Sequence, residues 1–500
     1  MSAVKPYLPA APSRAPAWLA LAMGAAMAVL GTLFFAHLGA GHLLLAVALG
    51  VVAALGVVYL GARAMGFGGA VVALMVGCAL LVPNRVTMPL TPKVWGEAWD
   101  FSILLSGFWL LLLAMGLLMG GHRLRATGME KWFAALFAVA LLSLLVNINR
   151  YGDLDPAARG MVRLFAPMVT LPLVASVPMS RRQRGLLLTC LIILAVVVFG
   201  MGLFTTFRWW WTRLGPIGSL VFSPIQSALG RTRSPLGGPH VMALVLAMIA
   251  PVALVRMLGA RSLGRQVLYG AIALFLLAGV VFSLSRSAVA VALLGMLFFG
   301  AINRRALERR ALLTVTLLVL AALVIVGVVD AYRNRLNFGR LIWVVTRQGQ
   351  VLRSDRLRSS SVEAALRITE RHPLIGSGIG RWYPRDRSIT PVKIYGAVSA
   401  REPHSLFLIT LSEMGGIGLL LIAVIVVKPV RDFLRAHHAA RDLESRALLS
   451  ALATGALMVA LYGVTASGVM VGYRMAYFLW AFLGLGYQLV FETQEETRAP

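Results

Sequence analysis

The residues of this chain best suited to chemistry are arginines and one histidine that lie beside apolar segments. Arg286 stands in Ser-Leu-Ser-Arg-Ser between two apolar runs, and Arg231 and Arg233 precede another run. His404 precedes a third. A guanidinium group keeps its charge and binds phosphate through parallel hydrogen bonds, whereas an imidazole titrates near neutral pH and accepts protons. Together they indicate a site that holds a diphosphate and takes a proton from a hydroxyl group.

Each of these residues also has a purely structural interpretation. An arginine at the end of a membrane helix can extend its charge to lipid phosphates, and a single histidine at a helix entrance often serves packing. Glu413, about two turns inside the apolar segment after His404, is a further costly charge in apolar surroundings. We favour a shared anion site because segments far apart in the sequence supply arginine at the same expected membrane face.

A long polar segment, residues 330–404, separates two groups of apolar runs. It holds fourteen Lys/Arg and six Asp/Glu, and a basic excess of this size indicates an anionic partner. Within it, Ser360 followed by Glu363 forms a capping-box pattern, which predicts a short helix that begins there and ends before Pro373.

A glycine-rich turn follows this predicted helix. Its sequence is Pro-Leu-Ile-Gly-Ser-Gly-Ile-Gly, and the glycines at 376, 378 and 380 predict backbone with positive φ and close approach to a neighbour. A phosphate-binding role is conceivable. The turn lacks the Lys-Ser/Thr pair and the preceding strand of a P-loop, so we do not expect nucleotide binding.

The composition requires a membrane protein. Hydrophobic residues make up 59% of the 500 residues, charged residues 13%, and the mean hydropathy is +0.82. A water-soluble fold is therefore excluded for most of the chain. We predict an all-α polytopic integral membrane protein with about fourteen transmembrane helices. The apolar runs span residues 17–37, 43–61, 67–83, 101–120, 132–148, 163–179, 185–206, 239–257, 266–283, 287–302, 311–329, 405–427, 447–464 and 471–490.

The short loops predict the orientation. Lys and Arg gather in alternate loops, which the positive-inside rule assigns to the cytoplasm. Both termini are then cytoplasmic and the long loop is periplasmic. The predicted organisation is helices 1 to 11 in residues 1–329, the periplasmic loop in 330–404, helices 12 to 14 in 405–490 and a cytoplasmic tail in 491–500. The first apolar run is about 20 residues long, which predicts a retained helix and not a signal peptide.

The cysteines and histidines give no sign of a metal or a disulfide. Cys78 and Cys190 both fall inside predicted helices, where a thiol behaves as a small apolar group. The eight histidines show no metal-ligand spacing. We therefore expect no metal and no cofactor.

Three blocks of the sequence resemble the O-antigen ligase/polymerase family of bacterial membrane glycosyltransferases. The first is Phe282–Ala288 around the Ser-Arg pair, the second runs from Arg358 through the glycine turn to Gly380, and the third joins His404 to Glu-Met-Gly-Gly-Ile-Gly. A looser match covers Arg231 to His240. The departures from the family pattern are His240, Val362 and Ser405.

The resemblance implies glycosyl transfer on the periplasmic face of the bacterial inner membrane by a GT-C-like helical protein. A polyprenyl-diphosphate-linked glycan is the donor, an acceptor hydroxyl attacks the anomeric carbon, and no metal takes part. The family assigns Arg231 and Arg286 to the diphosphate and His404 to the acceptor proton. The other predicted substrate-binding residues are Arg233, Arg358, Gly376, Gly378, Gly380, Arg381 and Glu413.

Several functions remain open at this point. A polymerase joins repeat units, whereas a ligase transfers the finished glycan to lipid A core. We favour the polymerase because about fourteen helices exceed what we expect of a ligase. A protein O-glycosyltransferase, a transporter of an anionic solute and a scaffold of an export complex are the alternatives. The expected partners are the lipid-linked donor, a glycan or lipid A core acceptor, membrane lipids, a flippase and a chain-length regulator, without nucleic acid.

Overall fold

The computed structural model describes residues 43–81, 101–150, 154–206, 238–283, 285–304, 353–380, 393–394, 397–398, 405–466 and 473–498. This part of the chain is helical except for a two-residue antiparallel pair, β1 (Lys393–Ile394) and β2 (Ala397–Val398). Seven of the described helices are long and apolar enough to cross a bilayer. The prediction of an all-α polytopic membrane protein is confirmed. The runs expected at 17–37 and 311–329 lie outside the described residues, so the count of fourteen stays a prediction.

The N-terminal half contains six described α-helices and one 3-10 turn. They are α2 (Leu43–Leu81), α3 (Phe101–Met119), α4 (Glu130–Val146), η2 (Ile148–Arg150), α5 (Asp155–Met168), α6 (Thr170–Ser176) and α7 (Arg181–Thr206). A kink at Gly66, with φ 76° and ψ 158°, divides α2 into two segments that match the two predicted runs. The run expected at 163–179 is divided between α5 and α6. Pro172, which cannot donate a backbone hydrogen bond, accounts for this interruption.

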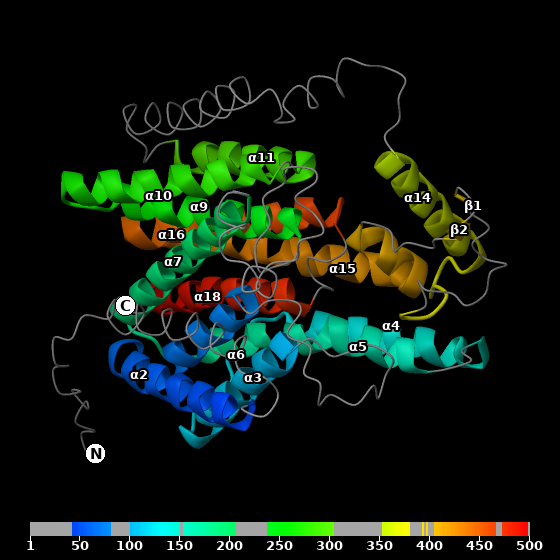
Figure 1. Ribbon diagram of the computed structural model, residues 1–500, viewed down its shortest axis with the longest axis horizontal. Coiled ribbons are helices and arrows are strands. Elements are labelled where there is room, and N and C mark those ends of the chain that lie inside the picture. The colour runs from blue at the N-terminus through cyan, green and yellow to red at the C-terminus, as the bar shows by residue number, and fades with distance from the viewer. Residues whose placement is uncertain are drawn as a thin grey trace.

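The C-terminal half contributes seven described helices. They are α9 (Pro239–Leu258), α10 (Leu263–Phe282), α11 (Arg286–Asn303), α14 (Arg353–Arg371), α15 (Leu406–Ala439), α16 (Leu443–Gly463) and α18 (Tyr473–Arg498). In Figure 1, α18 lies between α15 and the N-terminal helices, and α9 lies against α10 and α16. α9 and the apolar part of α18 show no polar face, and 83% of the most apolar window of α9 and 89% of that of α18 is buried. They form the core on which the other helices pack.

The helix of the polar segment begins earlier than the sequence predicts. α14 starts at Arg353, so Ser360 lies inside it, and the capping-box prediction of the helix start is wrong. Glu363 pairs with Arg367 one turn later instead. The arginines and leucine before Ser360 are good helix formers, and they extend the helix upstream. The predicted end before Pro373 is correct.

The last helix continues past its apolar run because its acidic end has basic partners. Glu492 accepts two hydrogen bonds from the guanidinium of Arg184, at 2.5 and 2.7 Å. Glu495 lies 3.2 Å from Arg125, and Glu496 pairs with Arg181. These contacts tie the segment predicted as a tail to α7 and to the loop before α4.

Two of these ion pairs, Arg184–Glu492 and Arg125–Glu495, should differ in their effect on stability. The side chain of Arg184 is only 4% exposed, so Glu492→Gln leaves a buried cation without its counter-charge. We expect a loss of about 3–5 kcal/mol in the free energy of unfolding. Glu495→Gln removes a pair whose side chains are 46% and 64% exposed and should cost about 0–1 kcal/mol. Thermal unfolding of both variants in detergent tests the difference, and equal losses would contradict it.

Contacts between helix ends show which termini share one end of the bundle. The hydroxyl of Tyr462, near the end of α16, donates to the carbonyl of His240 at the start of α9 (3.3 Å). A Cβ on Gly463 would lie 3.4 Å from the side chain of Leu406, the first residue of α15. At the other end of the bundle, Asn303 closes α11 and donates to Ser450 of α16 at 2.8 Å. The starts of α9, α11 and α15 and the ends of α10 and α16 therefore face the same side.

Candidate functional site

The glycine turn after α14 docks into a break in α15. Gly415 interrupts the helix with φ 68° and ψ −167°. The segments 373–378 and 412–417, here called the glycine junction, are joined by backbone hydrogen bonds. These are Ser377 N to Ser412 O (2.9 Å), Gly378 N to Glu413 O (3.0 Å), Gly416 N to Pro373 O (2.8 Å) and Ile417 N to Leu374 O (3.4 Å). The polar groups that the break releases from the helix are thus paired with the turn.

Only glycine fits at the two positions where the backbones cross. A Cβ on Gly376 would lie 2.3 Å from the carbonyl carbon of Glu413, and one on Gly415 would lie 2.3 Å from that of Leu374. Gly376, Gly378 and Gly380 have φ of 75°, 111° and 74°. The prediction of positive φ and close backbone approach is confirmed, and the neighbour that the turn approaches is α15.

Glu413 lies two turns inside α15, as predicted, and its carbonyl is a centre of the junction. The residue is 8% exposed. Its carbonyl oxygen accepts from Gly378 and also from the hydroxyl of Ser143 in α4, at 2.7 Å. An ionisable side chain held among apolar helices is a costly feature, which supports a functional role. Its assignment to substrate binding stays a prediction.

Two polar residues, one in α4 and one at its end, complete the junction, and neither is predicted as a site residue from the sequence. Ser143 donates to Glu413, while the Asn147 amide donates to the carbonyls of Gly376 (3.3 Å) and Ser143 (2.8 Å). Both side chains are buried, at 0% and 2% exposure. Their signal in the sequence is a pair of polar residues spaced four apart on one face of an otherwise apolar helix.

Removing either polar group should loosen the junction. Ser143→Ala leaves one hydrogen bond of a buried carbonyl unmade, and Asn147→Ala leaves the Gly376 carbonyl without its side-chain donor. We expect each to lower the free energy of unfolding by about 1–3 kcal/mol. Thr189→Val is the matched control, because within the described part of the chain the Thr189 hydroxyl bonds to the backbone of its own helix, at Gly185. Thermal unfolding measures the effect, and a loss no larger than that of the control would contradict it.

Arg286 is the first residue of α11, as the sequence predicts. The hydroxyl of Ser285 caps the helix by accepting from the amide of Ala288 at 3.4 Å. The hydroxyl of Ser283 accepts from the Ser285 amide at 3.2 Å and donates to Val280 at 2.6 Å. The serines of Ser-Leu-Ser-Arg therefore form the turn that places Arg286 at a helix N-terminus, where the helix dipole also attracts anions.

The other predicted site residues are only partly placed. His404 lies outside the described residues, but the next residue, Ser405, caps α15 by accepting from Leu408 at 3.3 Å. Arg231, Arg233 and Arg381 also lie outside the described residues. Arg358 belongs to α14, but its side chain is not described. Among the described residues, no three His, Cys, Asp or Glu side chains are grouped to hold a metal ion.

The family blocks are nevertheless placed at one end of the bundle. Arg286 begins α11 and Ser405 caps α15, and both helix starts face the side where α16 ends. The glycine junction lies two turns into α15 from the same side. Figure 1 places α14 and the start of α15 together at the right, away from the end of α18. The arginine predicted to bind the diphosphate, the residue after the candidate base and the junction thus share one face.

The comparison with known families agrees with this arrangement. Residues 271–423 match a sequence model of the family described as O-Antigen ligase. Over these residues the chain is similar to O-antigen ligases. The matched segment runs from inside α10 to the second half of α15, and it contains all three blocks of the resemblance. The looser match at Arg231–His240 lies before it. No curated protein matches the chain.

Proposed function

We propose that this protein is a glycosyltransferase that polymerises polyprenyl-diphosphate-linked oligosaccharide units into a surface polysaccharide. We place the reaction at the periplasmic face of the bacterial inner membrane, with both chain termini in the cytoplasm. The observation that supports this most is the shared end of the bundle. There, the helix that begins with Arg286 and the helix that follows His404 start on the side of the glycine junction.

The proposed chemistry is direct transfer between two lipid-linked glycans. The hydroxyl of the acceptor attacks the anomeric carbon of the donor while the bond from that carbon to the diphosphate oxygen breaks. Arg286 and Arg231 stabilise the charge that develops on the departing diphosphate, assisted by the N-terminus of α11. His404 accepts the proton of the attacking hydroxyl. No metal is needed in this scheme because arginines supply the positive charge.

The glycine junction contributes to this chemistry by holding the surrounding helices in place, and its amides do not bind the substrate. The amide of Gly376 donates to His372 at 3.1 Å and that of Gly378 donates to Glu413, so both amides already have acceptors within the protein. We therefore propose that these glycines shape the site and hold α14 against α15. Arg358, Arg381 and the basic loop around them then face the donor, with Glu413, Gly380 and Arg233 at the edge of its binding site.

The broken helix could also suggest a transporter of anions. In transporters, the amides that a helix break releases bind anionic groups of the substrate, and the released carbonyls bind a coupled cation. In this chain the carbonyl of Ser412 accepts from the amide and the hydroxyl of Ser377, at 2.9 and 3.1 Å. The carbonyl of Glu413 accepts from Gly378 and Ser143. The amides of Gly416 and Ile417, which follow the break, donate to the carbonyls of Pro373 and Leu374. Because both the amides and the carbonyls at the break are paired within the protein, the break favours a structural junction over an ion site.

Reconstitution in liposomes identifies the acceptor of the glycan. The purified protein in liposomes receives a lipid-linked repeat unit with or without lipid A core, and a gel resolves the products. A ladder from the repeat unit alone is the expected result. Product only in the presence of core would replace the polymerase with a ligase, the second candidate, which the family description favours. Uptake of an anionic solute without any glycan product would overturn the proposal.

A further inference from the structure

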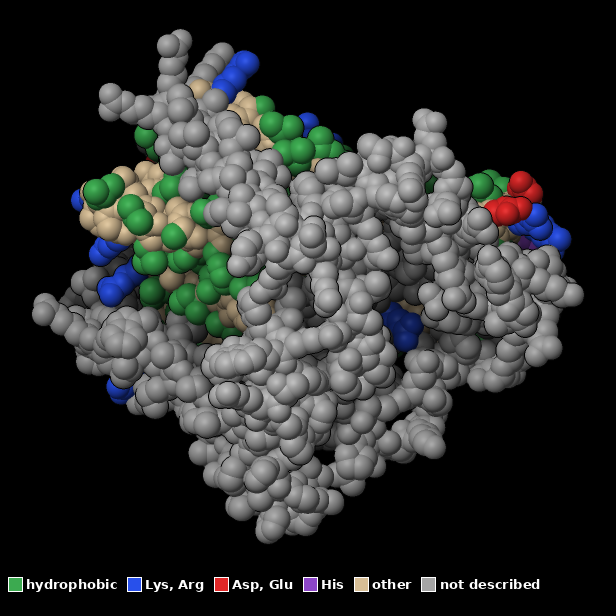
Figure 2. Space-filling view, turned by 45° about the horizontal axis from the view of Figure 1, so that its top comes forward, with side chains coloured by type: hydrophobic (Ala, Val, Ile, Leu, Met, Phe, Trp, Pro, Cys, Tyr) green, Lys and Arg blue, Asp and Glu red, His purple; other side chains and the backbone are tan. Residues whose placement is uncertain are grey.

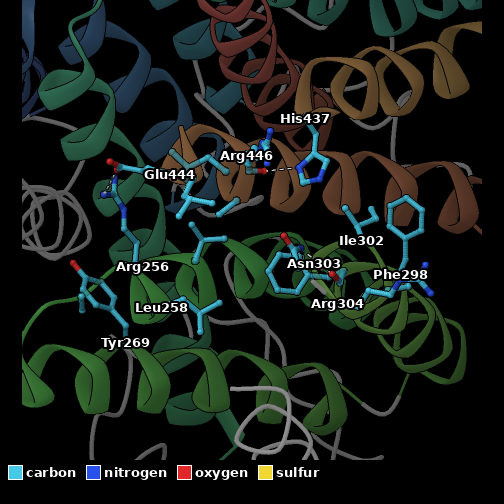
Figure 3. A pocket seen from close by; sticks show the side chains of 18 of the residues that line it. Arg256, Leu258, Tyr269, Phe298, Ile302, Asn303, Arg304, His437, Glu444 and Arg446 are labelled. Carbon is cyan, nitrogen blue, oxygen red and sulfur yellow. Dashed lines mark hydrogen bonds and ion pairs between the residues drawn. The ribbon is translucent and has the colours of Figure 1, made fainter. Parts of the chain in front are cut away.

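A cavity of about 1620 Å³ lies at the end of the bundle opposite the glycine junction. The end of α9, the start of α10, the ends of α11 and α15 and the start of α16 enclose it. We call it the basic cavity for the arginines that line it, which are Arg256, Arg261, Arg265, Arg304 and Arg446. Figure 3 shows Arg256 on one side of the cavity, Arg304 on another and Arg446 on the helix between them.

The positive charge of the basic cavity is mostly unbalanced. Among the described residues that line the cavity, Glu444 is the one carboxylate; it lies 3.6 Å from Arg256 and its side chain is 67% exposed, so it screens the cavity weakly. The nearby Asp442 is engaged elsewhere. Burial alone would raise the pKa of Asp442, but hydrogen bonds from Ser445 and the charge of Arg181 outweigh burial and lower it. This carboxylate caps α16 and is not a counter-ion for the cavity.

Several guanidinium groups remain available to a ligand. Arg261, Arg265 and Arg304 are exposed and make no ion pair within the described part of the chain. Arg446 donates its Nε to the carbonyl of Ala440 at 2.6 Å, which fixes the direction of its two terminal nitrogens. The Nε of Arg256 is buried and has no hydrogen-bond partner among the described residues. Donors from three helices, from the turn between α9 and α10 and from the residue that follows α11 therefore line one cavity.

The cavity also has an apolar wall that continues to the outside of the molecule. Leu258, Phe298 and Ile302 line it. Beside it, Leu263 and Val267 of α10 are 75% and 62% exposed. Figure 2 shows hydrophobic side chains at the left of the molecule, where Figure 1 places α10, with Lys and Arg side chains along the edge. Free phosphate would gain nothing from this wall, whereas acyl chains would.

We propose that the basic cavity binds the phosphate group of an anionic phospholipid whose acyl chains lie along α10. Arginines at helix ends lie at the depth of lipid headgroups, and their planar donors match phosphate oxygens. α10 begins in this cavity without a side-chain cap, so its positive end adds to the attraction. The bound lipid bridges the α9–α11 group to α15 and α16. The site is separate from the transfer chemistry and does not depend on it.

A thermal unfolding experiment distinguishes the sources of the phosphate. The full-length protein in a neutral detergent is titrated with short-chain phosphatidylglycerol, with phosphatidylcholine of the same chain length, or with inorganic phosphate. We expect only phosphatidylglycerol to raise Tm. An equal rise with phosphatidylcholine would show apolar contact alone, and an equal rise with inorganic phosphate would show a free-phosphate site. Either result would overturn the proposal.

Two double variants test whether phosphatidylglycerol binds in the basic cavity. Arg265→Gln with Arg304→Gln removes two exposed cations of the cavity, and Arg182→Gln with Arg435→Gln removes two exposed cations outside it. We expect the cavity variant to bind phosphatidylglycerol at least about tenfold more weakly, since charged hydrogen bonds are lost, and the control to bind normally. If the double variant does not fold, the single variants and the phospholipid that co-purifies with each give the same comparison. Equal lipid binding by cavity and control variants would overturn the proposal.

Discussion

Gly376→Ala and Gly415→Ala should each abolish polymer formation and destabilise the protein. Each new Cβ would overlap a backbone carbonyl carbon at 2.3 Å, and each residue holds a positive φ that strains alanine. Since the obstructing atoms are main chain, no side chain can move aside. We expect a loss of at least about 3 kcal/mol in the free energy of unfolding, because strain and overlap add.

The matched control is Gly200→Ala in α7. A Cβ at Gly200 meets nothing within 4 Å, and the residue is helical, so alanine should be neutral or slightly stabilising. Thermal unfolding and the reconstituted polymerisation assay report on the two effects separately. Normal polymer and normal Tm in either junction variant would show that the turn does not dock into α15 as described.

Substitution of His404 or Arg286 should remove activity without loss of the folded protein. His404→Ala removes the proposed base, for which we expect a rate lower by about 10²–10⁴-fold. Arg286→Ala removes the positive charge that stabilises the leaving diphosphate, and we expect the rate to fall by about 10²–10³-fold. Ser285 caps α11 through its own hydroxyl, so the start of the helix does not require the arginine side chain.

A control variant and a measurement of folded protein distinguish a loss of catalysis from a loss of folding in the His404 and Arg286 variants. Arg435→Ala removes an exposed arginine at the opposite end of α15 and should leave the rate unchanged. Folded protein is quantified by size-exclusion chromatography before the assay. His404→Gln, which cannot accept a proton at neutral pH, should be as inactive as the alanine variant. Normal polymer from both His404→Ala and Arg286→Ala would refute their catalytic roles.

The sequence could predict features that depend on local chemistry. The Ser-Arg pair at a helix start, the depth of Glu413 and the positive φ of Gly376 all follow from neighbours close in the chain, and the structure confirms them. The apolar runs also predict the described spanning helices, because the length and composition of a segment decide whether it can cross a bilayer as a helix.

Features that depend on distant contacts could not be predicted. The turn at Gly376 meets α15 through hydrogen bonds between residues more than 30 positions apart, and Ser143 reaches Glu413 across 270 positions. No local pattern encodes such pairing. The extension of α18 has the same origin, since Glu492 continues the helix by pairing with Arg184 of another element.

The most direct test of glycosyl transfer is the release of polyprenyl diphosphate. The purified protein in liposomes is given the lipid-linked repeat unit in the presence of a chelator, and both the released carrier and the new glycosidic bonds are counted. We predict one polyprenyl diphosphate per bond formed, with neither product from His404→Ala. Absence of carrier release from the wild-type protein, or equal release from His404→Ala, would contradict the account.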